Sequence, residues 1–171
     1  MMYQEEVKQR FLDSGIVFTE KELSSIDYAD FGLKRLESEG LNLIVYENND
    51  RYCAKEMVLL PGQTCPEHRH PPREGDVGKR ETFRCRKGKV YLYVEGEATP
   101  VIQSNIPEGQ EAHYTVMHEV ELNPGEQYTI EPNIKHWFQA GNEGAIISEF
   151  SSPSDDASDI FTNPEIQRVT K

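Results

Sequence analysis

Apolar side chains recur at helical spacing along the first 40 residues of the chain. They stand at every fourth position from Tyr3 to Phe11, and Gly15 follows where helices commonly end. Residues 19–22 carry a capping-box pattern, which opens a second helix that we expect to run through Tyr28. Residues 1–40 are therefore predicted to form a helical arm.

From residue 41 the helical spacing gives way to short apolar or alternating runs separated by turn residues. The runs predicted as strands cover residues 41–46, 52–60, 89–94, 113–120, 126–130 and 145–150. Gly- and Pro-containing turn signals lie between them, for example at 61–62, 87–88 and 141–142. Many short strands with no helices between them favour an all-β fold, either a sandwich or a jelly-roll barrel.

The length of the chain suits one domain. Its 171 residues can enclose one hydrophobic core but hardly two. We predict a single domain spanning 1–171, with the helical arm at 1–40, a β-barrel at 41–150 and a tail at 151–171. The tail is rich in Ser and Asp, and its few apolar residues, Ile160, Phe161 and Ile166, are expected to pack back loosely.

Charge and composition narrow the classes of partner. The chain has 30 acidic and 18 basic residues, a net charge of -12, and such a surface repels nucleic acid and anionic membranes. No apolar run is long enough to cross a bilayer, and because the first residues are acidic and not apolar we expect no leader peptide there. The three cysteines form no CxxC pair and cannot all be bridged, which favours a cytoplasmic location.

One group of residues has the pattern of a metal site. His68 and His70 stand two apart, so on a strand both imidazoles point to the same face. Glu81 adds a carboxylate and His136 a third imidazole, and this set suits a divalent first-row metal. An isolated His-x-His is common on strands, and His113 and His118 are interpreted as ordinary surface histidines.

Two stretches of the sequence resemble the motifs of the cupin superfamily. Residues 62–88 resemble the first motif, although ten residues separate His70 from Glu81 where the usual pattern has only a few. Residues 125–136 resemble the second motif, with Asn133 in place of its glycine, and asparagine tolerates the left-handed turn conformation. The resemblance implies a jelly-roll barrel, the double-stranded β-helix, with the helical arm added to it.

Within the cupins, the chain resembles the small D-lyxose ketol-isomerases. The resemblance rests on residues 55–62, 66–72, 80–84, 88–93 and 131–137, together with the long insert after His70. It implies a Mn²⁺-dependent, usually dimeric enzyme that interconverts D-lyxose and D-xylulose. Carried over to this sequence, the metal ligands are His68, His70, Glu81 and His136.

The resemblance also implies two catalytic residues on strands that flank the metal strands. Lys55 and Glu149 are charged positions within otherwise apolar runs, and the family uses a lysine and a glutamate there. We expect Lys55 to act as an acid or charge stabiliser and Glu149 as the base, by an enediol or a hydride-shift route. If neither faces the metal, the insert, with Glu74, Asp76 and Lys79, is the next place to look.

Three other functions stay open at this stage. A phosphosugar isomerase uses a similar ligand set and needs cations aimed into the barrel, for which Arg84 and Arg86 are candidates. The basic run 79–89 is otherwise expected to be solvated on the outward face of an edge strand. A cupin dioxygenase uses nearly the same ligands, and a non-catalytic sugar-binding cupin is the alternative outside enzymes.

Overall fold

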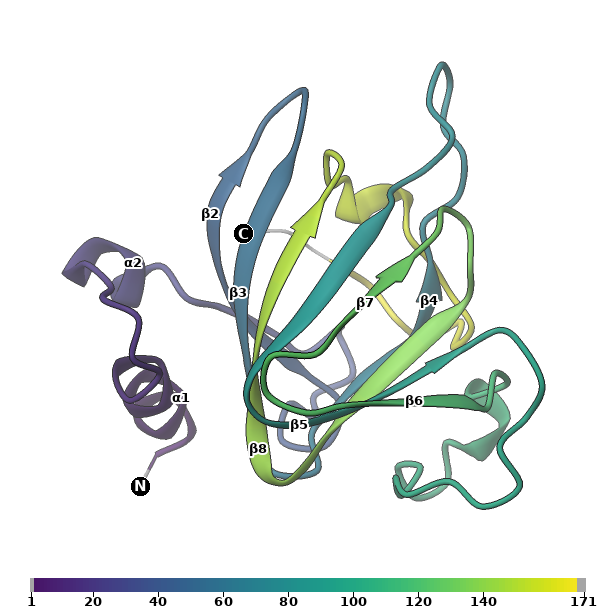
Figure 1. Ribbon diagram of the computed structural model, residues 1–171, viewed down its shortest axis with the longest axis horizontal. Helices are drawn as coiled ribbons and strands as arrows, with labels where there is room; N and C mark the ends of the chain where they lie inside the picture. The colour runs from purple at the N-terminus through teal and green to yellow at the C-terminus, as the bar shows by residue number, and fades with distance from the viewer. Residues whose placement is uncertain (1, 169–171) are drawn as a thin grey trace.

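The computed structural model describes residues 2–168, which form a curled antiparallel sheet with two short helices beside it (Figure 1). None of the helices in this range is long and apolar enough to cross a membrane. The helices are α1 (Tyr3–Leu12) and α2 (Glu20–Ser24). The strands are β1 (Asp27–Ala29), β2 (Leu41–Asn48), β3 (Cys53–Leu59), β4 (Thr64–Arg69), β5 (Glu81–Val94), β6 (His118–Leu122), β7 (Gln127–Ile130), β8 (His136–Ser151) and β9 (Ile160–Phe161).

Two long strands give the sheet its curl. β8 pairs with β3 and β4, and β5 pairs with β6, β7 and β8. β5 has 14 residues and β8 has 16, and the two are paired with each other along nearly their whole length. Both strands bend at their middles, so the sheet folds over on itself as a half-barrel. The prediction of an all-β fold is confirmed.

The bends in β5 and β8 correct two predicted turns. Residues 87–88 and 141–142 do not end strands but lie inside β5 and β8. The pairing register shifts between Cys85 and Lys87 and again between Gly88 and Val90, which marks β-bulges. Gly88 has a positive φ of 73°, and a Cβ there would collide with the carbonyl oxygen of Gly144. Glycine is therefore needed for a close backbone approach at a bend, not for a turn between strands.

Two other predicted elements are wrong in part. The second helix ends at Ser24, and Tyr28 lies in β1, paired with Asn42 of β2. The predicted strand 113–120 begins only at His118. Residues 115 and 116 form no ladder because their backbone N–H groups donate to the carboxylate of Glu67, at 2.6 and 3.0 Å.

The apolar side chains form three buried clusters on different faces of the sheet. The largest fills the inside of the half-barrel. The second lies under the helical arm, where Val7 and Phe11 of α1 pack on the outer face of β2, β3 and β8. The third, around Trp137, lies under the long connection between β5 and β6. The two outer clusters anchor the helical arm and the connection between β5 and β6. Polar side chains occupy one end of the inner face.

The C-terminal segment is bound more firmly than the predicted loose packing. It leaves β8 at Ser151 and returns as β9, which pairs with β4 at His68 and Arg69. Phe161 and Ile166 pack against the inner cluster. Pairing at the free edge of β4 explains why so short and polar a tail is ordered here, because the edge offers unpaired backbone groups.

Candidate metal and catalytic site

The four residues predicted as metal ligands come together at one end of the half-barrel. His68 and His70 stand at the end of β4, His136 begins β8 opposite His68, and Glu81 begins β5. One ligand atom from each lies within 4.8 Å of the others, and all four side chains are buried. Strand alternation places them together, because inward-facing residues of three adjacent strands converge at this end.

Each imidazole is oriented by a hydrogen bond on its outer nitrogen. The Nδ1 atoms of His68 and His136 lie 2.8 Å from the backbone oxygens of Pro66 and Ile134, respectively. Nδ1 of His70 lies 2.6 Å from Oδ1 of Asp159. These oxygens accept hydrogen bonds, so each Nδ1 carries a proton, and in the neutral form of each ring Nε2 turns a lone pair towards the centre.

The centre of the cluster fits a divalent cation. Nε2 of His136 lies 2.8 Å from Oε1 of Glu81, yet it has no hydrogen-bond partner among the described residues. Nε2 of His70 lies 3.2 Å from the same oxygen. Lone pairs of nitrogen that converge on a carboxylate are satisfied by a metal ion, and oriented imidazoles with one carboxylate are a typical donor set for first-row metals.

The pKa values of two histidines of the cluster are shifted in opposite directions. Burial and the neighbouring imidazoles hold the pKa of His68 well below its usual range. Burial also disfavours a charged His70, but the Glu81 carboxylate and the bond to Asp159 outweigh it and raise the pKa of His70 to about 9. The Glu81 and Asp159 carboxylates therefore favour positive charge at His70, whereas burial lowers the pKa of His68 and favours its neutral form.

Lys79 contacts two buried carboxylates of the site. From the sequence it was named only among the residues of the insert after His70. Its Nζ lies 2.7 Å from Oε2 of Glu81 and 2.5 Å from Oε1 of Glu149, and its side chain is 5% exposed. Burial lowers the pKa of Lys79, but the two carboxylates more than compensate and raise it far above its usual value. The carboxyl pKa of Glu81 falls well below its usual range, because Lys79 and His70 outweigh its burial.

The expectation that the basic run 79–89 is solvated on an edge strand is therefore wrong in part. Arg84 and Arg86 are exposed on the outer face, but Lys79 is buried, and β5 pairs on both sides. The signal that could have found Lys79 is its position two residues before Glu81 in an extended chain, which puts both side chains on one face. The outward Arg84 and Arg86 also leave the phosphosugar alternative without its two candidate cations.

The structure places both predicted catalytic residues in the same cavity. Lys55 of β3 pairs with Glu149 of β8, and both side chains are buried. Glu149 meets Lys79, whereas Nζ of Lys55 lies 3.1 Å from Oγ of Ser154 and 3.9 Å from Oδ1 of Asp156. Lys55 thus contacts the C-terminal segment rather than the metal cluster.

The cavity is small and is closed by the C-terminal segment. Its volume is about 40 Å³. Its walls are the ligands His68, His70 and Glu81, the charged pair Lys55 and Glu149, Lys79, aromatic side chains such as Phe31, Phe83 and Phe138, and Asp156, Asp159, Phe161 and Arg168 of the C-terminal segment. That is room for a few waters, whereas ligand pockets usually measure roughly 300–1,000 Å³. The sequence prediction assigned no site residue to this segment, because its spacing follows no strand or helix period.

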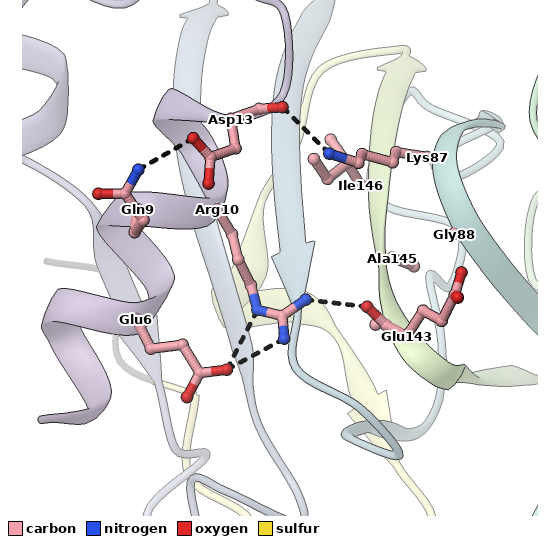
Figure 2. Close-up of a pocket in the computed structure, with 10 residues that line it drawn as sticks. Glu6, Gln9, Arg10, Asp13, Lys87, Gly88, Glu143, Ala145 and Ile146 are labelled. Carbon is pink, nitrogen blue, oxygen red and sulfur yellow. Dashed lines mark hydrogen bonds and ion pairs between the residues drawn. The ribbon is translucent and has the colours of Figure 1, made fainter. Parts of the chain in front are cut away.

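A larger cavity of about 510 Å³ lies between α1 and the bends of β5 and β8, and Figure 2 shows its side chains. Arg10 pairs with Glu6 at 3.0 Å and donates to the backbone oxygen of Glu143 at 2.9 Å. Lys87 donates to the backbone oxygen of Asp13 at 3.2 Å. These polar groups hydrogen-bond to one another and hold α1 against the sheet. We therefore interpret the cavity as part of the structural contact between α1 and the sheet.

Two histidines discussed from the sequence, and the tryptophan next to His136, lie away from the site. His118 begins β6 and its Nδ1 lies 2.9 Å from the oxygen of Glu97, while His113 lies in a single 3-10 turn. Neither belongs to the four-residue cluster. Trp137 is fully buried in the outer aromatic cluster and donates to the oxygen of Val116 at 2.8 Å, so it does not line the cavity.

Comparison with known proteins finds close relatives in sequence. The family model described as D-lyxose isomerase matches residues 19–171. A D-lyxose/D-mannose isomerase of Thermosediminibacter oceani is 65% identical over 166 residues, which cover 97% of this chain and 92% of the relative. A D-lyxose ketol-isomerase of Cohnella laeviribosi is 60% identical over 163 residues, covering 95% and 90% of the two chains.

Solved structures share the fold at low sequence identity. An L-ribose isomerase of Acinetobacter sp. DL28, in complex with L-ribose, superposes with a TM-score of 0.80 at 16% identity, covering 96% of this chain and 92% of that one. An RmlC-like cupin of Shewanella frigidimarina superposes with a TM-score of 0.51 at 14% identity, covering 83% and 93%. The predicted cupin-like architecture is confirmed.

Proposed function

Because the chain belongs to the D-lyxose isomerase family, and is therefore an aldose–ketose isomerase, we propose that it interconverts D-lyxose and D-xylulose at the buried cluster of three histidines and Glu81. One observation carries the assignment of the chemistry to this place. The Lys79 ammonium joins the carboxylate of Glu81 to that of Glu149 within the same cavity. A proton acceptor and a fixed positive charge thus stand beside the metal donors.

The reaction moves one hydrogen from C2 to C1 of the open-chain sugar and another from O2 to O1. In the enediol route we assign Glu149 as the base that removes the C2 proton. The proton on O2 passes to the adjacent O1, and Glu149 returns its own proton to C1. The sugar becomes the ketose and Glu149 ends in its original ionised form, so atoms and charges balance.

Lys79 stabilises the negative charge that develops on the sugar oxygens. Its raised pKa keeps it an ammonium throughout, which suits a charge stabiliser better than a proton donor. Its bond to Glu149 also orients that carboxylate, at 2.5 Å. Lys55, opposite Glu149 in the β-ladder, is proposed to stabilise charge farther from the cluster.

His68, His70, Glu81 and His136 are proposed to hold a divalent first-row metal, which this donor set suits, and Mn²⁺ is our assignment because the family resemblance implies it. When bound, such a metal supplies Lewis-acid stabilisation of negative charge on the sugar oxygens. The chain's own part is to fix the donors. The hydrogen bonds on each Nδ1 and the burial of all four side chains do this.

A hydride shift is the other route that this arrangement supports. In that route hydrogen passes directly from C2 to C1, and Glu149 abstracts no proton from carbon. Lys79 then stabilises charge on the oxygens only, and a metal held by the four donors would supply the same kind of stabilisation. Deuterium from solvent distinguishes the routes, because only an exchangeable proton on Glu149 can carry it to C1.

D-mannose is proposed as a second substrate. The relative from Thermosediminibacter oceani is named for both sugars and is 65% identical to this chain. D-mannose has the configuration of D-lyxose at C2, C3 and C4 and one additional carbon, so the reacting end is the same. The two sugars therefore differ only at the end remote from C1.

A panel of sugars tests the proposal. Protein loaded with Mn²⁺ under anaerobic conditions is incubated with free and phosphorylated aldoses, and products are followed by NMR. Formation of D-xylulose from D-lyxose supports the proposal, and formation of D-fructose from D-mannose supports the second substrate. If only phosphorylated sugars are converted, the protein is a phosphosugar isomerase. If sugars bind stoichiometrically but none is converted, the protein is a sugar-binding protein.

We also propose that the protein is cytoplasmic and forms a homodimer. Cys53, Cys65 and Cys85 are all free and buried, which fits a reducing compartment. The dimer is proposed from the family resemblance alone. Light scattering should give about twice the chain mass of 19.6 kDa, and a mass equal to one chain would overturn the dimer.

A further inference from the structure

The three imidazoles of the cluster differ in what holds them. His68 and His136 each donate from Nδ1 to a backbone oxygen two residues earlier in the chain, Pro66 within β4 and Ile134 just before β8. His70 donates instead to the Asp159 carboxylate, which lies 89 residues away in sequence. The orientation of two ligands is therefore built into their strands, whereas the third depends on a separate piece of chain.

That piece is the C-terminal segment, defined here as residues 152–168. Its ladder with β4 has only two residue pairs, and its far end is held by the ion pair between Arg168 and Asp27, at 2.8 Å. β9 pairs with His68 and Arg69, and the backbone N–H of Thr162 donates to the backbone oxygen of Glu67 at 3.1 Å. The hydroxyl of Thr162 also donates to Oε1 of Glu67, at 2.5 Å.

The same segment forms the wall that closes the cavity. Asp156, Asp159, Phe161 and Arg168 line it, and the ring of Phe161 lies 5.4 Å from that of His68. The strand walls opposite belong to long ladders of β3, β5 and β8. A space of about 40 Å³ does not admit a pentose, so a wall must open during turnover, and the segment with the shortest ladder is the one best able to do so.

We propose that Asp159 is a positioning residue for the metal centre and couples closure of the C-terminal segment to metal binding. The proposal rests on the proposed function, since it takes the cluster to be a metal site. A carboxylate on Nδ1 fixes the ring of His70 and makes Nε2 a stronger donor. The Asp159 carboxylate reaches His70 only when the segment is closed.

Reciprocity follows from this geometry. If the closed segment strengthens metal binding, then bound metal must favour the closed segment by the same free energy. Opening of the wall to admit sugar would weaken one metal ligand, and reclosure would restore it. The two ligands held by backbone oxygens keep their orientation throughout, so the metal need not leave.

The first test measures metal affinity. Mn²⁺ binding is titrated calorimetrically to the wild-type full chain and to the variants Asp159→Asn, Asp159→Ala and Glu165→Gln. Glu165 lies in the same segment and is exposed, so its variant is the matched control for loss of one carboxylate. We expect the Kd for Mn²⁺ to rise by roughly 10–100-fold in Asp159→Ala, less in Asp159→Asn, and not in the control.

The second test measures closure directly and does not depend on activity. Amide hydrogen exchange of residues 159–162 is followed with and without Mn²⁺. We expect Mn²⁺ to slow this exchange several-fold in the wild type and to have little effect in Asp159→Ala. Unchanged exchange in the wild type on addition of Mn²⁺ would overturn the coupling.

The outcomes separate this inference from the proposed function. If the wild type binds Mn²⁺ and isomerises D-lyxose while both Asp159 variants bind Mn²⁺ equally well, the inference fails and the function stands. If binding depends on Asp159 but no sugar is isomerised, the function fails and the inference stands. A wild type that binds no divalent metal overturns both.

Discussion

Two buried carboxylates lie on opposite sides of β4 and have opposite surroundings: Glu67 of β4 itself on the outer face, and Glu81 of β5 beside the histidines on the inner face. On the outer face Glu67 accepts from Thr115 and Val116 backbone groups and from the hydroxyls of Thr115 and Thr162, at 2.5–3.0 Å. On the inner face Glu81 meets the lone pairs of imidazoles and the Lys79 ammonium.

The difference separates a structural carboxylate from a functional one. Glu67 has neutral hydrogen-bond donors for both oxygens, and the Lys135 ammonium lies farther away, at 3.9 Å from Oε1. Its acceptors are therefore filled, and it ties the β5–β6 connection and the C-terminal segment to β4. Glu81 lies among groups that only a cation can satisfy together. Burial alone therefore does not mark a functional acid, and the nature of its partners does.

The largest loss of metal and activity is expected from a substitution in the cluster on the inner face. Glu81→Gln keeps the size of the side chain and removes the charge that a divalent metal requires. Metal content and turnover should fall together, by more than the roughly 100-fold that loss of an outer hydrogen-bond partner causes. Elemental analysis and kinetics on the same sample check this. Full metal occupancy with full turnover would remove Glu81 from the metal site.

The next effect separates chemistry from metal binding. Glu149→Gln should lower kcat by about 10²–10⁴-fold, the usual effect of losing a positioned base. Metal content should stay at the wild-type level, because Glu149 is not among the four proposed ligands. Wild-type turnover in this variant would mean that the base lies elsewhere.

A paired comparison decides between the two lysines of the cavity. Lys79→Met should lower kcat more than Lys55→Met does, because Lys79 contacts both carboxylates whereas Lys55 contacts Ser154. Thermal unfolding of both variants controls for loss of the buried ion pairs. A larger loss of kcat in the Lys55 variant would support the role of acid or charge stabiliser that the family resemblance implied for Lys55.

The smallest effect on catalysis comes from the outer face. Glu67→Gln places an amide group where only donors surround it, which should lower the free energy of unfolding by about 1–3 kcal/mol. At saturating Mn²⁺ its metal content should equal that of the wild type. Denaturant unfolding measures the stability, and a variant that loses metal before it loses stability would contradict the assignment of Glu67 as structural.

The sequence predicted the inner face well where its residues lie on regular strands. His68 and His70 follow strand alternation, and Asn133 takes the expected left-handed conformation with φ of 63°. Lys79 was missed because it lies outside the regular part of β5, where outward alternation of the basic run was assumed. Asp159 could not be predicted, because an irregular segment reaches the site through tertiary packing at a sheet edge and has no periodic signal.

Isomerisation of D-lyxose in D₂O tests the central claim most directly, since it reports both the activity and the role of Glu149. The account predicts that Mn²⁺-loaded protein forms D-xylulose carrying solvent deuterium at C1, visible by NMR, and that Glu149→Gln forms it far more slowly. Formation of D-xylulose with no deuterium at C1, at a rate that Glu149→Gln leaves unchanged, would contradict the proton transfer assigned here.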